Sequence, residues 1–340
     1  MGNQVRIMFA PSDLDGCGYY RVIQLQQMLQ TVDIGVVPLY AGPRSIEDQS
    51  QHVTFTQRVC DASDLMRVIQ FKEATKSKVI IDYDDLLWAD SKDDCPRYNV
   101  ALSYDAMAER REAMKKYLDE AADAVICTTD YLKARLSEFV HERKITVIPN
   151  CLSMRDWLFP RTTSVPKDES YLYAGSVTHY HNEKRLYGDF SIPLANYLRG
   201  KNFGFMGDVP PWFLRAKQHY KYVKCPVYSK SLYKYTRDWR YTLAPLAKNS
   251  FNMAKSDIKY LESCAVGRVC LVSDFEGSPY SGAHEKQKLP NGSGIKDISS
   301  VVGNLSDSYA EVVDYQYEYL NSRLLDNRLG DYAQVIQSVL

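Results

Sequence analysis

The chain has 340 residues, of which 45 % are hydrophobic and 25 % are charged, as in ordinary globular proteins. This length is sufficient for two domains with substantial cores. The 42 basic and 42 acidic residues cancel, which excludes a chain-wide electrostatic attraction to nucleic acid or membrane. The sequence shows no apolar run of about 18 residues and no signal-peptide pattern. Its eight cysteines are scattered and favour reduced thiols. We therefore expect a cytoplasmic protein without stable membrane insertion.

Strand-like and helix-like segments alternate along the first half of the chain. Val5–Ala10 reads as a buried strand, a loop follows to Gly18, and a helix runs from Tyr19 to about Gln30. Further strands are expected at Gly35–Leu39, Val53–Gln57, Val79–Asp82, Ala124–Cys127 and Ile145–Ile148, and helices at Ser63–Ala74, Ala106–Ala121 and Asp130–Phe139. This alternation predicts an α/β fold with a parallel, doubly wound sheet.

The same pattern starts again after Asp156–Glu169, a stretch rich in Pro, Thr and Ser that is typical of a linker. Strands are expected there at Tyr171–Ser176, Phe203–Met206, Thr242–Pro245 and Val269–Ser273, and mostly helix at Ser308–Leu340. Two successive α/β units predict a two-domain enzyme with a ligand cleft. We place the domains at 1–160 and 170–310, followed by a helical segment at 311–340.

The segment Pro245–Gly267 carries the most specific pattern of the chain. It reads as a strand end, a polar loop and a helix that opens at Ser256 and stops at Gly267. Lys255, Lys259 and Glu262 share one stripe of that helix. A helix N-terminus beside a lysine suits phosphate, and a carboxylate two turns on suits sugar hydroxyls. The pattern thus indicates a nucleotide-sugar pocket, although a surface helix with a serine cap and an ion-pair stripe has the same spacing.

This string resembles the donor-site motif of GT-B nucleotide-sugar glycosyltransferases, in particular the retaining Glu-x7-Glu group and a sub-group with Phe-Asn-x-Ala-Lys-Ser. The resemblance implies two Rossmann-like domains whose parallel sheets face across a cleft, with the C-terminal helix crossing back onto the first domain. It implies that Lys255 and Ser256 bind the diphosphate, that Glu262 binds the ribose, and that Asn252 belongs to the donor site. Ala254 stands where the motif has its first glutamate, so this sequence departs from the pattern.

Two glycine turns are expected to complete the donor pocket. Gly16 and Gly18 follow the first strand, where glycine lets the backbone approach a ligand; the third glycine of a dinucleotide fingerprint is missing, which argues against NAD. Gly175 and Ser176 follow Tyr171 in a Gly-Ser-x-Thr-His string that resembles the donor-domain turn of the same family. Turns of this kind also occur for geometry alone.

Three further residues are expected to act in the cleft on the strength of the same resemblance. His179 ends the Gly-Ser-x-Thr-His string and is expected to polarise a phosphate oxygen or to hold the sugar. Tyr20 and Arg21 match a Tyr-Arg pair that lines the side opposite the donor, and they are therefore assigned to acceptor binding. An exposed loop histidine without a catalytic role is the competing interpretation of His179.

Asp82-Tyr-Asp-Asp85 ends a strand and invites a metal interpretation. An Asp-x-Asp pair binds metal and diphosphate in single-domain glycosyltransferases, which have a different fold, and clustered carboxylates hold Mg²⁺ elsewhere. In the GT-B architecture a lysine and a helix dipole neutralise the diphosphate, so we expect no metal. Asp85 is expected to act in catalysis and Asp84 to contact the acceptor, with capping of the strand end as the alternative.

The segment Trp212–Tyr241 has eight Lys or Arg residues against one acidic residue, with nine aromatic residues between them. Cations suit phosphates and aromatic faces suit bases, so the segment predicts a nucleic-acid footprint with Lys217 and Lys221 at the acceptor. Tyr228 is expected to border the donor base. A solvated basic face over packed tyrosines gives the same composition.

Together these features favour a glycosyltransferase that moves a sugar from a nucleoside diphosphate, with uridine expected, to an acceptor hydroxyl. The resemblance implies retention at the anomeric carbon and no cofactor other than the UDP-sugar co-substrate. Our first acceptor hypothesis is a hydroxylated or hydroxymethylated pyrimidine flipped out of bacteriophage DNA, in the host cytoplasm. The alternatives are a transferase for cell-surface glycan or lipopolysaccharide, and a non-catalytic nucleic-acid-binding protein on a degenerate GT-B fold. The sequence does not fix the oligomeric state.

Overall fold

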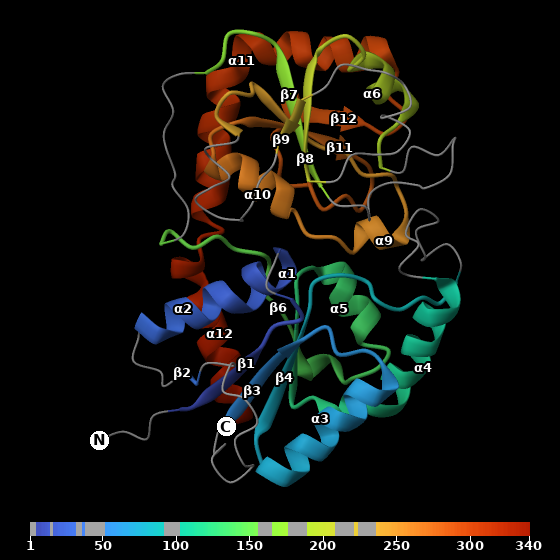
Figure 1. Ribbon diagram of the computed structural model, residues 1–340, viewed down its shortest axis with the longest axis vertical. Coiled ribbons are helices and arrows are strands. Elements are labelled where there is room, and N and C mark those ends of the chain that lie inside the picture. Colours follow the sequence, from blue (N-terminus) through green and yellow to red (C-terminus); the bar gives the residue numbers. More distant parts are fainter. Residues whose placement is uncertain are drawn as a thin grey trace.

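The computed structural model describes residues 5–13, 16–31, 36–37, 52–91, 103–155, 165–175, 189–207, 221–223 and 236–340. Within these ranges the chain forms two α/β domains, one below the other in Figure 1, and each is built on a parallel sheet flanked by helices. This arrangement confirms the two Rossmann-like domains that the sequence predicts. Among the described helices, none combines the length and the apolar character that crossing a bilayer requires.

The N-terminal sheet has the order β2-β1-β3-β4-β5-β6, and all of its described pairings are parallel. Its strands are β1 Ile7–Ala10, β2 Val36–Val37, β3 Val53–Gln57, β4 Lys78–Tyr83, β5 Ala124–Cys127 and β6 Ile145–Val147. Its helical elements are α1 Gly16–Gly18, a π-helical turn at Tyr19–Ile23, α2 Gln24–Thr31, α3 Ala62–Thr75, α4 Tyr104–Ala121, α5 Asp130–Leu136 and a 3₁₀ turn at Glu142–Lys144. The nearly continuous burial of β4 is what a strand covered on both faces requires.

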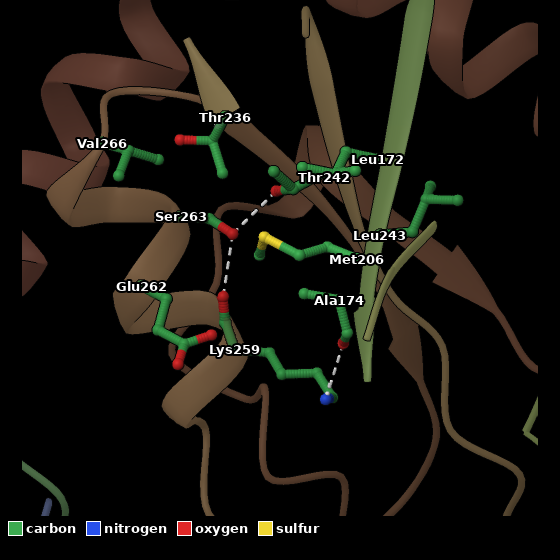
Figure 2. Close-up of a pocket in the computed structure, with 10 residues that line it drawn as sticks. All are labelled: Leu172, Ala174, Met206, Thr236, Thr242, Leu243, Lys259, Glu262, Ser263 and Val266. Atoms are coloured by element: carbon green, nitrogen blue, oxygen red, sulfur yellow. Dashed lines mark hydrogen bonds between the residues drawn. The ribbon is translucent and has the colours of Figure 1, made fainter. Parts of the chain in front are cut away.

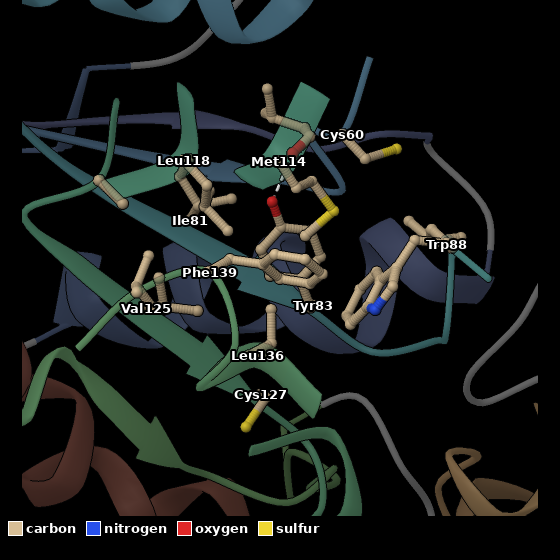
Figure 3. Packing of buried hydrophobic residues seen from close by; sticks show 14 of the residues in the cluster. Cys60, Ile81, Tyr83, Trp88, Met114, Leu118, Val125, Cys127, Leu136 and Phe139 are labelled. Atoms are coloured by element: carbon tan, nitrogen blue, oxygen red, sulfur yellow. Dashed lines mark hydrogen bonds between the residues drawn. The ribbon is translucent and has the colours of Figure 1, made fainter. Parts of the chain in front are cut away.

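Apolar side chains fill both faces of this sheet. On one face Ile81 and Tyr83 of β4 pack with Met114 of α4 and with Trp88 (Figure 3). The Tyr83 hydroxyl donates a hydrogen bond to the Val59 carbonyl, which satisfies the one polar atom of that ring. On the other face the apolar residues of β1 and β3 pack against α2 and against the last helix of the chain.

The C-terminal sheet has the order β12-β11-β10-β7-β8-β9 and is also parallel throughout its described pairings. Its strands are β7 Ser170–Gly175, β8 Asn202–Gly207, β9 Lys221–Val223, β10 Tyr241–Ala244, β11 Val269–Asp274 and β12 Lys288–Pro290. The helices are α6 Ile192–Tyr197, α9 Ser250–Met253, α10 Ile258–Ala265, a 3₁₀ turn at Glu285–Gln287, α11 Ile295–Asn321 and α12 Leu325–Val339. The apolar stripe of α10 covers one face and that of α11 covers the other.

The chain crosses between the domains twice, and the two crossings are hydrogen-bonded to each other. Leu152 donates its N–H to the Arg323 carbonyl at 3.1 Å, and Leu325 donates to the Leu152 carbonyl at 3.0 Å. After the second crossing α12 packs Tyr332 and Val335 against the N-terminal sheet (Figure 1). The C-terminal helix therefore crosses back onto the first domain, as expected. Position 311, where we placed the start of this segment, lies inside α11, which stays on the second domain.

Two element boundaries differ from the sequence predictions for physical reasons. The helix expected to begin at Ser256 begins at Ile258, because the Ser256 side chain bonds to the other domain instead of capping the helix. The long C-terminal helix begins at Ile295, well before Ser308, because Asp297 caps its start by accepting the Gly294 N–H at 2.8 Å. Ser308 itself has non-helical backbone angles and lies at a kink within α11.

Candidate active site where the two domains meet

The segment from α9 to α10 lies against the N-terminal domain. Phe251 and Ala254 are buried in the same apolar cluster as Trp88 of that domain. The side chain of Ala254 is 0 % exposed. The position of the first motif glutamate is therefore filled by a methyl group inside an apolar contact, where an unpaired carboxylate would be strongly unfavourable.

Lys255 of this segment faces a charged side chain of the N-terminal domain. Its ammonium nitrogen lies 3.5 Å from Asp85 Oδ1 of the N-terminal domain, and it also lies 4.5 Å from the centre of the Phe251 ring. The side chains of Lys255 and Asp85 are 14 % and 21 % exposed, so both remain accessible to a ligand. The structure thus brings together one residue expected at the donor diphosphate and one expected in catalysis.

Ser256 is held from the opposite domain as well. Asn150 donates a hydrogen bond from Nδ2 to the Ser256 hydroxyl at 2.6 Å. The Asn150 side-chain oxygen accepts from Arg21 Nη1 at 3.3 Å, and its backbone oxygen accepts from Arg323 Nε at 3.1 Å. Arg323 also pairs with Asp257 at 2.7 Å, immediately before α10. The start of α10 is therefore fixed to both crossings of the chain.

Arg21 lies in the interior, below the surface that an acceptor could touch. Its side chain and that of Asp82 are each 0 % exposed, and they form a bidentate ion pair with a shortest distance of 2.6 Å. Arg21 also donates to the Ile148 carbonyl at 2.8 Å. The assignment of Arg21 to acceptor contact is corrected accordingly. In this structure Arg21 is a buried charge that holds the ends of β4 and β6 together.

Glu262 lies on the inner side of α10 and is 9 % exposed. Its Oε1 accepts a hydrogen bond of 2.5 Å from the Tyr20 hydroxyl, which comes from the N-terminal domain. Burial raises the pKa of the Glu262 carboxyl, while the Tyr20 hydrogen bond and the nearby Lys259 ammonium partly offset that rise. Tyr20 itself is 6 % exposed, so it faces the Glu262 carboxylate rather than an open surface.

A small pocket lies between α10 and the C-terminal sheet. Figure 2 shows Glu262 and Lys259 on its wall, with Lys259 Nζ donating to the Ala174 carbonyl at 2.8 Å. The other lining residues are Leu172, Ala174, Met206, Thr236, Thr242, Leu243, Ser263 and Val266. Burial lowers the pKa of Lys259, and the Glu262 carboxylate opposes that change. The pocket combines an apolar floor with hydroxyls and one acid–base pair.

Asp84 and Asp85 follow β4 and are bridged by Arg58, which follows the neighbouring β3. Arg58 Nε lies 2.5 Å from Asp84 Oδ1, and Nη2 lies 2.9 Å from Asp85 Oδ2. Burial alone would raise the pKa of Asp84, but the Arg58 guanidinium outweighs it and holds the pKa of that carboxyl below its ordinary value. Arg58 adopts a left-handed φ of 60°, an unfavourable backbone conformation that its three side-chain partners offset.

The side chains of Cys17, Asp84 and Asp85 are the one described group with metal-ligand spacing, since their ligand atoms lie within 4.8 Å of one another. Arg58 Nη2 already lies 2.8 Å from Cys17 Sγ and 2.9 Å from an oxygen of each carboxylate. A guanidinium in this position supplies one of the two positive charges that a divalent cation would bring. Burial raises the pKa of the Cys17 thiol, and Asp84 adds to that rise, so a metal-binding thiolate is disfavoured there.

Gly18 and Gly175, one from each predicted turn, lie where another group approaches closely. A Cβ at Gly18 would lie 1.8 Å from the Asp13 carbonyl oxygen, and Gly18 donates its N–H to Asp13 Oδ1 at 3.0 Å. A Cβ at Gly175 would lie 2.4 Å from the Tyr173 hydroxyl. Gly16 begins the short α1 turn that carries the chain toward Tyr20. The close approaches account for Gly18 and Gly175 by geometry alone.

Asn252 serves the loop rather than the surface. It is 0 % exposed, and its Nδ2 donates to Asp189 Oδ1 at 2.6 Å and to the Ala247 carbonyl at 2.8 Å. The assignment of Asn252 to direct donor contact is therefore corrected to a structural role. Ser176, His179, Lys217 and Tyr228 lie outside the described residues, and Lys221 is described only as part of the backbone of β9.

Arg58 and Asn150 are site residues that the sequence patterns did not predict. Each follows the end of a parallel strand, β3 and β6 respectively, and polar residues at that edge of a doubly wound sheet are the usual ligand-facing positions. Their position after a predicted strand was the sequence signal that could have identified them. Their partners Asp84, Asp85 and Ser256 are distant in sequence, so the pairing itself could not be predicted.

No family model and no curated protein matches the chain, whereas several solved structures do. A glycosyltransferase from Rickettsia africae aligns over 99 % of both chains with 12 % identity and a TM-score of 0.65. The lipopolysaccharide outer core galactosyltransferase WaaB aligns over 99 % of this chain and 100 % of its own, with 12 % identity and a TM-score of 0.60. HepE from Anabaena, solved with UDP and glucose, aligns over 98 % of this chain and 100 % of its own, with 8 % identity and a TM-score of 0.67. This chain has the GT-B fold.

Proposed function

We propose that this protein is a glycosyltransferase that uses a nucleoside diphosphate sugar as donor. One observation carries the proposal: Lys255, Ser256 and Glu262 stand in sequence order on one loop and helix, and the opposite domain touches each of them. Such a row offers a cation and a hydroxyl for a diphosphate and a carboxylate for a pentose. The GT-B likeness of the whole chain supports the same assignment.

The chemistry of this site follows from its charges. Lys255 would stabilise the diphosphate as it departs, which is the negative charge that grows in the transition state. The Glu262 carboxylate would accept hydrogen bonds from pentose hydroxyls, beside the pocket under α10. Uridine is the nucleoside we propose, because HepE was solved with UDP and the motif resemblance points the same way.

We further propose that transfer retains the anomeric configuration and needs no metal ion. The buried Ala254 removes the first motif carboxylate, so Asp85, beside Lys255, is the accessible carboxylate of the described site. Arg58 and Lys255 supply two positive charges where Asp84 and Asp85 supply two negative ones. His179, Ser176 and Tyr228 remain proposed donor contacts, as do Gly16, Gly18 and Gly175.

The acceptor has two candidate classes. WaaB, which shares this fold, is a lipopolysaccharide outer core galactosyltransferase, so a glycan hydroxyl is the class that a structural neighbour supports. The DNA hypothesis rests on the basic and aromatic segment 212–241, with Lys217 and Lys221 as phosphate contacts. Asp84 is 7 % exposed and bound by Arg58, so it would act on an acceptor indirectly, by holding the Arg58 guanidinium that also binds Asp85. The non-catalytic alternative predicts no response to any nucleotide-sugar.

Two measurements test these proposals together. The melting temperature is followed while UDP, GDP and ADP sugars are titrated, and a catalyst is expected to be stabilised by one nucleoside class. The protein is then incubated with the stabilising donor and either a lipopolysaccharide core oligosaccharide or duplex DNA containing hydroxymethylated pyrimidines. Mass spectrometry identifies the product that gains a hexose or pentose. Stabilisation by no donor and transfer to no acceptor would leave the non-catalytic alternative.

A further inference from the structure

Tyr20 is the one described residue of the N-terminal domain that hydrogen-bonds to the donor-side glutamate. It lies in a π-helical turn at Tyr19–Ile23, a rare backbone form that often occurs at functional sites. The turn sends two successive side chains in different directions. Tyr20 reaches Glu262 of the C-terminal domain, while Arg21 reaches Asp82 of its own sheet.

The Tyr20 ring is built into the C-terminal domain rather than resting on it. It belongs to the apolar cluster that includes Leu261 and Cys264 of α10. The neighbouring Tyr19 ring packs edge-on against it, with 5.2 Å between the two ring centroids. With the ring fixed in this way, the hydroxyl is aimed at Glu262 Oε1. Among the described residues no hydrogen bond reaches Glu262 Oε2, so one oxygen is held and the other is available.

We propose that Tyr20 is a positioning residue of the donor site, supplied by the opposite domain, that orients Glu262 so that its second oxygen accepts a hydroxyl of the donor pentose. This inference rests on the proposed function and replaces the acceptor role that we predicted for Tyr20. Among the residues that the structure describes, two groups face the Glu262 carboxylate: the Tyr20 hydroxyl from the first domain and the Lys259 ammonium from α10. Lys259 is engaged by the Ala174 carbonyl, so Tyr20 is the group that fixes the orientation.

The arrangement has a consequence for pH. Burial raises the pKa of Glu262, and the Tyr20 hydrogen bond favours the ionised form. Removing that hydroxyl raises the pKa of Glu262 further, so a smaller fraction of the carboxyl is ionised at any mildly acidic pH. As the pH is lowered, donor binding that needs the carboxylate is therefore lost at a higher pH in the Tyr20→Phe variant than in the parent protein.

The test compares Tyr20→Phe with Tyr19→Phe, which removes a neighbouring phenol hydroxyl and leaves the Tyr20–Glu262 pair intact. Affinity for UDP is measured by calorimetry from mildly acidic to neutral pH. We expect Tyr20→Phe to weaken UDP binding about tenfold, as for loss of a hydrogen bond to a charged group, and to move the acid limb of the affinity profile to higher pH. Tyr19→Phe should bind UDP as the parent does.

A second measurement follows the Glu262 carboxyl without any ligand. Glutamate labelled with ¹³C at the carboxyl carbon is titrated by NMR, and the Glu262 signal is assigned by its loss in Glu262→Gln. A higher carboxyl pKa in Tyr20→Phe alone supports the inference. Equal UDP profiles in Tyr20→Phe and the parent, or equal losses in both tyrosine variants, would overturn it. Failure of the parent protein to bind UDP would instead remove the donor assignment, whatever the carboxyl titration shows.

Discussion

Lys255 and Asp85 come from different domains, and their charged atoms lie 3.5 Å apart. This distance is longer than a strong ion pair, and both side chains stay partly exposed. A diphosphate that binds Lys255 would therefore displace a weak partner rather than break a buried bond. The pair marks a place where charged side chains of the two domains meet.

Lys255→Met should abolish turnover while leaving the fold intact. The charge that faces the leaving group is lost, and removal of one such electrostatic contact lowers kcat about 100-fold or more. The matched control is Lys248→Met, whose side chain is 45 % exposed and lies 3.5 Å from Glu276. Steady-state kinetics with the donor found by thermal shift give the comparison. Full activity of the Lys255 variant would refute its role.

Ala254→Glu, which restores the motif residue, should destabilise the protein instead of improving activity. The side chain would enter the apolar contact with the cluster around Trp88. A buried, unpaired carboxylate there lowers the free energy of unfolding by on the order of 3 kcal/mol. Ser300→Glu on the exposed side of α11 is the control for adding a charge. Denaturant unfolding measures the difference. An Ala254→Glu protein as stable as the control would show that this contact opens readily.

Arg21→Met should cost about 3–5 kcal/mol of stability, because it leaves the buried Asp82 carboxylate without its partner. Arg67→Met is the surface comparison. The Arg67 guanidinium lies 3.5 Å from the Asp64 carboxylate, and the Arg67 side chain is 79 % exposed. We therefore expect this variant to lose less than about 1 kcal/mol of unfolding free energy. Urea denaturation of both variants at neutral pH provides the measurement. Equal losses would contradict the buried position of Arg21.

Glu262→Gln should raise the melting temperature at neutral pH and abolish donor binding. The folded pKa of Glu262 lies above the ordinary glutamate value, so this group favours the folded state most at low pH. Its contribution declines as pH rises from the unfolded value of about 4.3 toward the folded one. The neutral amide removes that decline. The stability gain over the parent should therefore be larger at pH 7 than at pH 4, and a gain that is equal at both would contradict the raised pKa.

The fold class and the strand–loop–helix order of the segment Pro245–Gly267 could be predicted from the amino-acid sequence alone. Apolar runs such as Val79–Ile81 are buried on both faces in any parallel sheet, and Gly267, with φ of 64°, ends its helix as predicted. These are local properties, in which side-chain spacing and backbone preference act within one element.

The way in which the two domains meet could be learned only from the folded chain. The Tyr20–Glu262 and Asn150–Ser256 hydrogen bonds join residues 242 and 106 positions apart, and Arg58 reaches Asp84 and Asp85 from a different strand. The burial of individual polar side chains could not be predicted either. The same residue type is accessible or buried according to how the surrounding elements pack. Arg21 and Asn252 are fully buried, whereas Lys255 stays accessible, and the physical reason is which domain surface each side chain meets.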